Sequence, residues 1–391
     1  MKTRREEARI KFINLLIKPA SSLCNLRCRY CFYADEAQNR AFPSMGFMTE
    51  ETADCLIRQA FKAAGSDGVI SFAFQGGEPT LAGLPFFQHF VEKVSEYRKQ
   101  DVYQHVRIFY SIQTNGTLLT KEWAAFLGQN RFLTGLSIDG QRSLHDRYRL
   151  DADGKATWSR VLNAKSLLEE AGASCNALCV VTGPAAEDAE GVYRRLKSLG
   201  FRYQQYIACL DPIGSKKGQQ EYSLTPEAYG AFLCQLFDLW FEDWARGNYH
   251  SIRLFDDYVH ILLGDGASTC ATCGRCGSYF VVEGDGSVYP CDFFALDKWK
   301  MGNLKEKSLA ELKTSQAAER FKSLGEERSR RPVECPSCPY RQVCRGGCKN
   351  DWYSDQKGVH NYFCPSFQKL LDHAMPGLIH IARREAAYES Q

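Results

Sequence analysis

The sequence lacks several features that would place it in a broad class of protein. No apolar run reaches the ~18 residues that a membrane-spanning helix needs. The first segment, MKTRREEARIKFINLLIKPA, has no small-residue cleavage site, and Lys18 breaks its apolar run, so it does not predict a signal peptide. No basic stripe interleaved with aromatic residues is present, and the net charge is only +3, which disfavours nucleic acid as a partner. We therefore expect a cytoplasmic protein with no membrane or nucleic-acid partner.

Cysteine, by contrast, is abundant, with 17 residues in a chain of 391. The cytoplasm keeps thiols reduced, so clustered cysteines there indicate metal or redox chemistry more than disulfide bonds. Five of the thiols fall within apolar patterns that are typical of core positions, where a free cysteine behaves as a small hydrophobe: Cys55, Cys175, Cys179, Cys209 and Cys234. The other twelve form clusters near both ends of the chain, and their spacing carries the functional argument.

The first half of the chain alternates between short apolar stretches and longer amphipathic ones. The short stretches are rich in Val, Ile, Phe and Tyr, which predicts strands at 12–17, 68–74, 106–112, 132–138, 175–181 and 203–210. The longer stretches, such as 49–64, 84–99 and 158–172, repeat apolar residues every three or four positions, as helices do. Six such β-α repeats predict an α/β fold with a parallel sheet, either open and doubly wound or closed into a full or partial barrel.

The pattern changes after Pro226. Helical stretches at 226–246 and 252–263 lead into a Cys-rich region at 270–364, in which 279–291 predicts a hairpin. We therefore predict a tail at 1–11, a β/α domain at 12–240, and a carboxyl-terminal domain at 241–391 that ends in a helical tail.

Cys24, Cys28 and Cys31 follow the first predicted strand with the spacing C-x3-C-x2-C. A loop at the carboxyl end of a parallel strand faces the crevice where α/β folds bind ligands. Three thiolates on a four-iron cluster leave one iron without a protein ligand, and that iron is free to bind a substrate or cofactor. The alternatives are a structural zinc site that a distant His completes, or cysteines that lie together by chance.

This spacing after a first strand resembles the signature of the radical S-adenosylmethionine (SAM) superfamily. The resemblance implies a partial (β/α)6 barrel, in which the open iron of a [4Fe-4S] cluster chelates the amino and carboxylate groups of SAM. The segment Gly76-Gly77-Glu78-Pro79 resembles the GGEP motif of the superfamily, which implies that Gly76, Gly77 and Glu78 contact the SAM amino group.

Two further motifs end the third and fourth predicted strands. They are QTNG at 113–116 and SIDG at 137–140, and His145-Asp146-x-x-Arg149 follows the second. Ser137 and Arg149 are our candidates for the SAM ribose and carboxylate region, because the arginine fork suits a carboxylate. Each motif alone is weak, but one motif at each strand end makes the joint interpretation strong.

The carboxyl-terminal segment CPSCPYRQVCRGGC has the spacing C-x2-C-x5-C-x3-C. It resembles the SPASM extension of radical SAM enzymes, which carries two auxiliary four-iron clusters. The resemblance assigns one cluster to Cys270, Cys276, Cys291 and Cys348, and the other to Cys335, Cys338, Cys344 and Cys364. Cys273 is a ninth thiol that could displace a neighbouring ligand. Two zinc sites are the alternative, since four-cysteine spacing does not separate zinc from iron.

Longer stretches resemble one subfamily, the anaerobic sulfatase-maturating enzymes. They are 15–33, 71–83, 111–116 and 281–299, within a resemblance that spans roughly residues 14–364. The resemblance implies that a Cys or Ser in a Cys/Ser-x-Pro-x-Arg motif of a sulfatase is oxidised to Cα-formylglycine. A 5′-deoxyadenosyl radical from SAM would abstract hydrogen from the substrate Cβ, and an electron donor such as flavodoxin or ferredoxin would reduce the first of three [4Fe-4S] clusters. Asp292, directly after Cys291, is the base that the resemblance implies; the alternative is that it caps a turn after the hairpin.

The substrate contacts are less specific in the sequence. Tyr33, Gln75 and Gln113 lie beside motif residues and are candidates to line the substrate cavity. Recognition of the substrate arginine would need a carboxylate such as Asp256 or Asp257.

Two other functions compete with this interpretation. A SPASM-type peptide maturase that forms thioether or carbon–carbon links would share the cluster motifs, but it would not need the acid at position 292. A non-catalytic iron–sulfur electron carrier or zinc scaffold would not need GGEP, QTNG and SIDG at successive strand ends.

Overall fold

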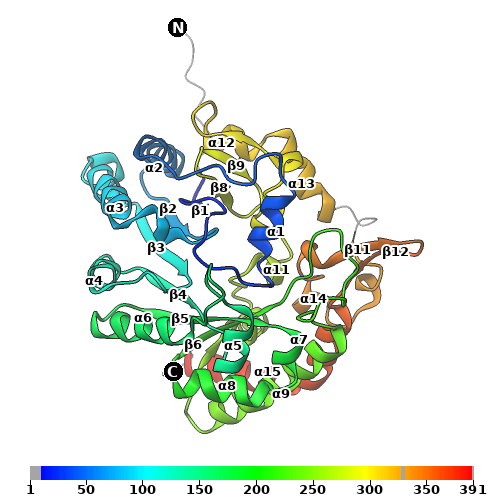
Figure 1. Ribbon diagram of the computed structural model, residues 1–391. Helices are drawn as coiled ribbons and strands as arrows, with labels where there is room; N and C mark the ends of the chain where they lie inside the picture. The colour runs from blue at the N-terminus through cyan, green and yellow to red at the C-terminus, as the bar shows by residue number, and fades with distance from the viewer. Residues whose placement is uncertain (1–9, 327–330, 390–391) are drawn as a thin grey trace.

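The structure, a computed structural model, describes residues 10–326 and 331–389, so most of the predicted tail at 1–11 lies outside the described residues. Its centre is a sheet in which six parallel strands lie side by side in chain order (Figure 1). The strands are β1 (Phe12–Ile17), β2 (Val69–Phe74), β3 (Arg107–Thr114), β4 (Leu133–Ser137), β5 (Cys175–Val181) and β6 (Tyr203–Ala208). All six predicted strands are confirmed, as is the α/β class with its partial barrel.

Amphipathic helices cover the outer face of these strands (Figure 1). The longer helices bury an apolar stripe against the sheet; α2, for example, buries Leu56, Ile57 and Phe61. Thr49 begins α2 and Thr225 begins α9 by accepting a hydrogen bond from a backbone N–H in the first turn. The helices of this half are α1 (Phe32–Gln38), α2 (Glu50–Ala64), α3 (Leu84–Arg98), α4 (Lys121–Gln129), α5 (Arg142–Tyr148), α6 (Trp158–Glu170), α7 (Gly183–Ala186), α8 (Ala189–Ser198) and α9 (Pro226–Ala245).

The sheet continues at both ends with strands from the second half of the chain. β7 (Ser251–Ile252) extends it beyond β6, while β8 (Phe280–Val282) pairs in parallel with β1 and carries β9 (Ser287–Tyr289) and β10 (Gly302–Asn303) beyond it. β8 and β9 form the predicted hairpin. One ten-stranded sheet therefore joins the two halves of the chain, and the predicted boundary at residue 240 falls inside α9.

The Cys-rich region packs beside the barrel rather than apart from it. Its long helix α15 lies against α9, and the hairpin of β11 and β12 lies at the periphery (Figure 1). The elements are α10 (Arg253–Leu263), α11 (Cys270–Cys273), α12 (Leu309–Lys313), α13 (Gln316–Glu326), α14 (Arg341–Cys344), β11 (Trp352–Asp355), β12 (Gly358–Asn361) and α15 (Cys364–Glu389). The helical stretches at 226–246 and 252–263 and the helical tail are confirmed.

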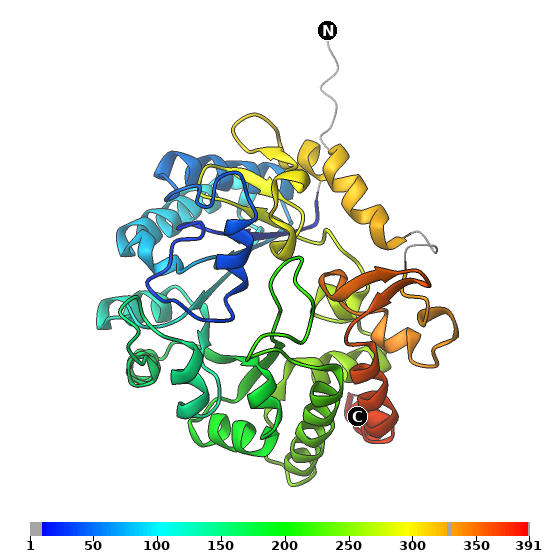
Figure 2. The ribbon, with the colours of Figure 1, turned by 45° about the vertical axis from the view of Figure 1, so that its right-hand side comes forward.

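The loop after β6, at 209–224, crosses the open side of the barrel between the first and last parts of the chain (green in Figure 2). The Ile213 amide donates to Asp35 of α1 at 2.7 Å, and the Lys217 ammonium lies 5.1 Å from the ring centre of Tyr362. This loop therefore contacts both the cysteine-bearing start of the barrel and the Cys-rich region. Among residues 10–326 and 331–389, no helix combines the length and apolar content that crossing a bilayer would need.

Candidate active site

A cavity of about 330 Å³ opens at the carboxyl ends of the parallel strands. The loop after β1 contributes the thiols of Cys24, Cys28 and Cys31, and the end of β4 contributes Ser137. Other elements bring the remaining predicted residues of this site to the same cavity: Tyr33, Gln75, Gly76, Gly77, Glu78, Gln113, Arg149 and Asp292. The structure thus brings together the residues that the sequence predicted for the first cluster, SAM, the lining of the substrate cavity and the base.

The cysteine loop and the GGEP segment lie in close backbone contact. The amide of Gly77 donates to the Ser21 carbonyl, and the amide of Glu78 donates to the Leu23 carbonyl, each at 2.8 Å. A Cβ added at Gly77 would lie 2.0 Å from the Leu23 oxygen, and Gly76 has a φ of +112°. Glycine is needed here because the two backbones approach too closely for a side chain.

The burial of Cys24 and Cys28 favours a cationic ligand beside their thiols. Burial raises the pKa of Cys24 to about 11 and that of Cys28 to about 12. A buried thiolate is costly without a positive partner, whereas a coordinating metal deprotonates a thiol outright. The thiols, facing a cavity next to a glycine loop, fit a cluster with one open iron.

Glu78 is buried and spans the ends of β2 and β3. Its Oε1 accepts hydrogen bonds from the Thr80 amide, the Thr80 hydroxyl and the Thr114 hydroxyl, and its Oε2 accepts from the Asn115 amide at 2.8 Å. Asn115 in turn donates to Asn25 and approaches the Cys24 sulfur at 3.8 Å. Glu78 therefore fixes the motif loops to each other; a contact to SAM stays a prediction.

Arg149 forms a buried ion pair that the sequence interpretation did not include. Its Nε and Nη2 donate to the two carboxylate oxygens of Asp139 at 2.9 and 3.0 Å, and the Tyr30 hydroxyl also donates to Asp139. Burial raises the pKa of Asp139, but Arg149 outweighs this effect and holds it below its ordinary value. The fork that we expected to bind the SAM carboxylate is therefore already directed at Asp139, although Arg149 still lines the cavity.

Asp292 is fixed in the cavity wall by three neighbours. Its Oδ2 accepts from the Tyr33 hydroxyl at 2.6 Å and from the Gln75 amide at 3.3 Å. The Lys18 ammonium lies 3.1 Å from Oδ1, as an ion pair rather than an aligned hydrogen bond. Two of the predicted substrate-lining residues, Tyr33 and Gln75, thus contact the predicted base itself, while Gln113 lines the cavity from the end of β3.

The sequence reasoning missed a buried charge cluster behind Asp292. Lys18 lies 3.3 Å from Glu36 and 3.7 Å from Glu283, and Arg40 contacts the same two carboxylates at 2.8 and 2.7 Å. Burial lowers the pKa of Lys18, but Asp292, Glu283 and Glu36 raise it more, so the ammonium stays charged. The one signal in the sequence was a lysine directly after an apolar strand.

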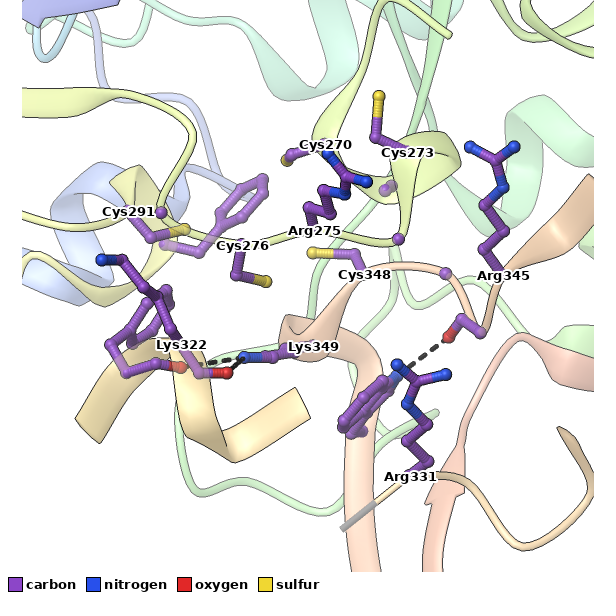
Figure 3. Close-up of a pocket in the computed structure, with 18 of the residues that line it drawn as sticks. Cys270, Cys273, Arg275, Cys276, Cys291, Lys322, Arg331, Arg345, Cys348 and Lys349 are labelled. Atoms are coloured by element: carbon purple, nitrogen blue, oxygen red, sulfur yellow. Dashed lines mark hydrogen bonds between the residues drawn. The ribbon is translucent and has the colours of Figure 1, made fainter. Parts of the chain in front are cut away.

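A second cavity, of about 370 Å³, holds the thiols assigned to the first auxiliary cluster (Figure 3). The sulfurs of Cys276, Cys291 and Cys348 point toward a shared centre, whereas that of Cys273 points away from it. The Cys273 thiol instead lies 3.1 Å from the Ala267 carbonyl oxygen. This arrangement supports the assignment of Cys273 as the surplus thiol. The same cavity is lined by Arg275, Lys322, Arg331, Arg341, Arg345 and Lys349.

The four thiols assigned to the second auxiliary cluster line a smaller pocket together: Cys335, Cys338, Cys344 and Cys364. Burial raises the pKa of Cys344 to about 11 and that of Cys364 to about 12, so these thiols too would need a cationic ligand to ionise. Cys335 lines both this pocket and the larger cavity of Figure 3.

In the described part of the chain, no group of three or more His, Cys, Asp or Glu side chains is arranged to hold a single metal ion. A four-iron cluster binds each thiolate to a different iron, so its ligand sulfurs lie further apart than those of a zinc site.

The two carboxylates suggested for the substrate arginine do not reach the cavity. Asp257 is buried and accepts from the Ser268 amide at 2.8 Å and from the Thr272 hydroxyl at 2.6 Å. Asp256 accepts from the Tyr249 hydroxyl at 2.7 Å. Asp256 holds the segment before α10 in place and Asp257 holds the loop before α11, so this suggestion is not supported.

Comparisons with known proteins agree with this geometry. Family models match the radical SAM superfamily over residues 19–196 and the SPASM iron–sulfur cluster-binding domain over residues 270–339. The cysteine-type anaerobic sulfatase-maturating enzyme of Clostridium perfringens (strain 13 / Type A) is 43% identical, covering 95% of this chain and 98% of the relative. The serine-type enzyme of Bacteroides thetaiotaomicron is 29% identical, covering 94% of this chain and 90% of the relative.

A solved structure described as native anSMEcpe with bound AdoMet and Kp18Cys peptide has a TM-score of 0.88 against this chain. The two are 41% identical, over 95% of this chain and 99% of that one. From the strand-end motifs, the thiol groups and these full-length similarities together, the chain belongs to the anaerobic sulfatase-maturating enzymes, a family within the radical SAM superfamily.

Proposed function

We propose that this enzyme oxidises a cysteine side chain in a sulfatase polypeptide to Cα-formylglycine. The observation that carries the proposal is the single cavity at the strand ends, where three thiols, the GGEP loop and Asp292 meet. The relatives favour cysteine over serine as substrate, because the cysteine-type enzyme is 43% identical and the serine-type enzyme 29%. A Cys-x-Pro-x-Arg segment is the proposed substrate motif.

Three groups of thiols would hold three [4Fe-4S] clusters. Cys24, Cys28 and Cys31 would hold the cluster that binds SAM, with Gly76, Gly77, Glu78, Ser137 and Arg149 around it. When bound, SAM and the clusters supply the radical that abstracts hydrogen and the sites that take up an electron. Eleven thiols are assigned as ligands: Cys24, Cys28, Cys31, Cys270, Cys276, Cys291, Cys348, Cys335, Cys338, Cys344 and Cys364.

The residues of the chain position the substrate and move its proton. Asp292 accepts the proton of the substrate thiol, while Tyr33 and Gln75 keep its carboxylate oriented toward the cavity. The side chain of Asp292 is 9% exposed, so bulk water has little access to this step.

We infer that the protein works in the cytoplasm, with a flavodoxin or ferredoxin as electron donor.

The decisive experiment incubates anaerobically reconstituted enzyme with SAM, a reductant, and matched peptides that differ only in Cys or Ser. Mass spectrometry should detect the aldehyde from the Cys peptide at least tenfold faster than from the Ser peptide. Asp292→Asn should slow aldehyde formation more than SAM cleavage, because only the former needs the base. SAM cleavage without any aldehyde from either peptide would refute the proposed function, and equal losses in both reactions would refute the role of Asp292.

A further inference from the structure

The cavity with the SAM motifs and the first auxiliary cavity share a wall. Tyr279 and Phe293 line both, and Tyr279 immediately precedes β8. Cys291, assigned to the auxiliary cluster, and Asp292, assigned as the base, are neighbours in the chain that serve different cavities. A side chain that touches both residues can therefore link the two sites.

The Tyr279 hydroxyl contacts both residues. The backbone amide of Asp292 donates to the Tyr279 oxygen at 3.3 Å, and this oxygen lies 3.5 Å from the Cys291 sulfur. A hydroxyl has one proton to donate, and a cluster-bound thiolate has none. The direction of both bonds is then fixed: the amide donates to the hydroxyl, and the hydroxyl donates to the sulfur.

Two more donors lie beside other cysteines that are assigned to the same cluster. The Asn350 amide donates to the Cys348 sulfur at 3.5 Å, and the Lys349 ammonium lies beside the Cys276 thiol (Figure 3). Lys349 is anchored there by the carbonyl oxygens of Phe321 and Lys322. Hydrogen bonds to ligand sulfurs and nearby positive charge stabilise the reduced form of a cluster, which carries one more negative charge.

We propose that Tyr279 is a positioning residue that sets the reduction potential of the auxiliary cluster next to the reaction cavity. The inference rests on the proposed function, which assigns Cys291 as a cluster ligand and Asp292 as the base. After hydrogen abstraction, the substrate must still lose one proton and one electron to become a thioaldehyde. The proton would go to Asp292, and the adjacent cluster, when bound in its oxidised form, would take up the electron. The hydrogen bond from Tyr279 would favour the reduced form of that cluster.

The test is an EPR-monitored redox titration of the reconstituted holoenzyme and its Tyr279→Phe variant. The variant keeps the ring that forms the wall and removes only the hydroxyl. We expect the midpoint potential of one auxiliary cluster to become more negative by about 59 mV. This shift corresponds to about a tenfold change in the equilibrium constant for one-electron reduction. The midpoints of the other two clusters should stay unchanged.

Tyr289→Phe is the matched control, because this buried tyrosine lies in the adjacent strand β9 and its hydroxyl has no hydrogen-bond partner among the described residues. Iron content should equal that of the wild type in both variants. If Tyr279→Phe does not retain iron, a second variant with 3-fluorotyrosine at position 279 is used in its place. The phenol of 3-fluorotyrosine is more acidic and therefore a stronger hydrogen-bond donor, so the midpoint potential of the same cluster should become more positive.

A midpoint that moves no more in Tyr279→Phe than in Tyr289→Phe, or that does not respond to fluorination, would overturn the inference. If wild-type enzyme holds its clusters and forms aldehyde while the midpoint stays fixed, only the role of Tyr279 fails. If wild-type enzyme takes up no iron or forms no aldehyde, the proposed function fails first.

Discussion

Lys18 supplies the buried positive charge nearest to Asp292. Replacing it with methionine keeps most of the side-chain volume but removes the cation paired with Asp292, and among the described residues it leaves Arg40 as the ion-pair partner of Glu36 and Glu283. Breaking a buried ion pair on one side typically costs about 3–5 kcal/mol, because the remaining charge loses its partner. We expect Lys18→Met to lower the free energy of unfolding by about that amount, measured by urea denaturation without oxygen.

The control for this prediction is Lys93→Met, which removes a surface ion pair between Lys93 and Glu96 on α3. Solvent and salt screen such a pair, so its loss should change stability little. Equal losses in the two variants would mean that the charge cluster behind Asp292 does not stabilise the fold.

A second residue-scale prediction concerns His145, which is buried in α5, shortly after the SIDG motif at 137–140. Its Nδ1 faces the Asp139 amide at 3.3 Å and its Nε2 faces the Thr157 hydroxyl at 3.0 Å. Burial lowers the pKa of His145 to about 4, from an ordinary value near 6.5. The imidazole of His145 thus stays neutral in the folded protein at pH values where the same imidazole binds a proton in the unfolded chain.

The sign of the pH dependence follows. The contribution of His145 is complete above pH ~6.5 and is lost as the pH falls toward 4, because protons then favour the unfolded chain. By pH 5 the loss should reach about 2 kcal/mol. In urea denaturation, the stability difference between wild type and His145→Gln should be constant above pH 7 and shrink on acidification by about this amount; a constant difference down to pH 5 would contradict the prediction.

At the scale of elements, the contact between the cysteine loop and the GGEP loop leaves no room for an added side-chain atom at Gly77. Gly77→Ala would place a methyl group 2.0 Å from the Leu23 oxygen and push the cysteine loop away. We expect iron to fall from about twelve to about eight per chain, because only the first of three four-iron clusters depends on this loop. Iron and sulfide assays measure the change.

Gly172→Ala is the control for this substitution. Its φ is +64°, and no atom lies within 4 Å of an added Cβ. The left-handed backbone costs a non-glycine residue about 1–2 kcal/mol but displaces no neighbour. This variant should keep its full iron content, and a similar iron loss in both variants would show that general instability, not the loop contact, removes the cluster.

The elements also show which patterns a sequence reveals. The six strands of the barrel and the helices α2, α3, α6 and α9 were predictable, because each is long enough to show an apolar period. β7 and β10 have two residues each and no period, so their pairing is visible only in the folded sheet. The hairpin of β8 and β9 was predicted, but its place beside β1 was not.

At the scale of the whole molecule, the continuous sheet predicts that the barrel does not fold alone. A chain that ends at residue 248 would lose β8 from the edge of β1 and α15 from the surface of α9, where the buried Phe237 packs against His373. Unpaired strand edges and exposed apolar faces lead to aggregation. We expect this fragment to elute as aggregate in size-exclusion chromatography, whereas the full chain does not; a monomer that unfolds cooperatively would contradict this.

The sequence alone determined the chemistry of this protein and most of its fold. Cysteine spacing, strand-end motifs and apolar periods are local patterns, and each is complete within a few neighbouring residues. They predicted the barrel, the thiol groups and Asp292 as a member of the site.

Only the tertiary structure decided which groups meet. It paired Arg149 with Asp139, brought Lys18, Glu36, Arg40 and Glu283 together behind Asp292, turned the Cys273 sulfur away from its neighbours, and kept Asp256 and Asp257 out of the cavity. These contacts join residues up to 265 positions apart, such as Lys18 and Glu283. The partner of a buried charge can lie anywhere in the chain. Burial makes the pairing necessary, and burial exists only after the chain has folded, so no local sequence pattern predicts which residues pair.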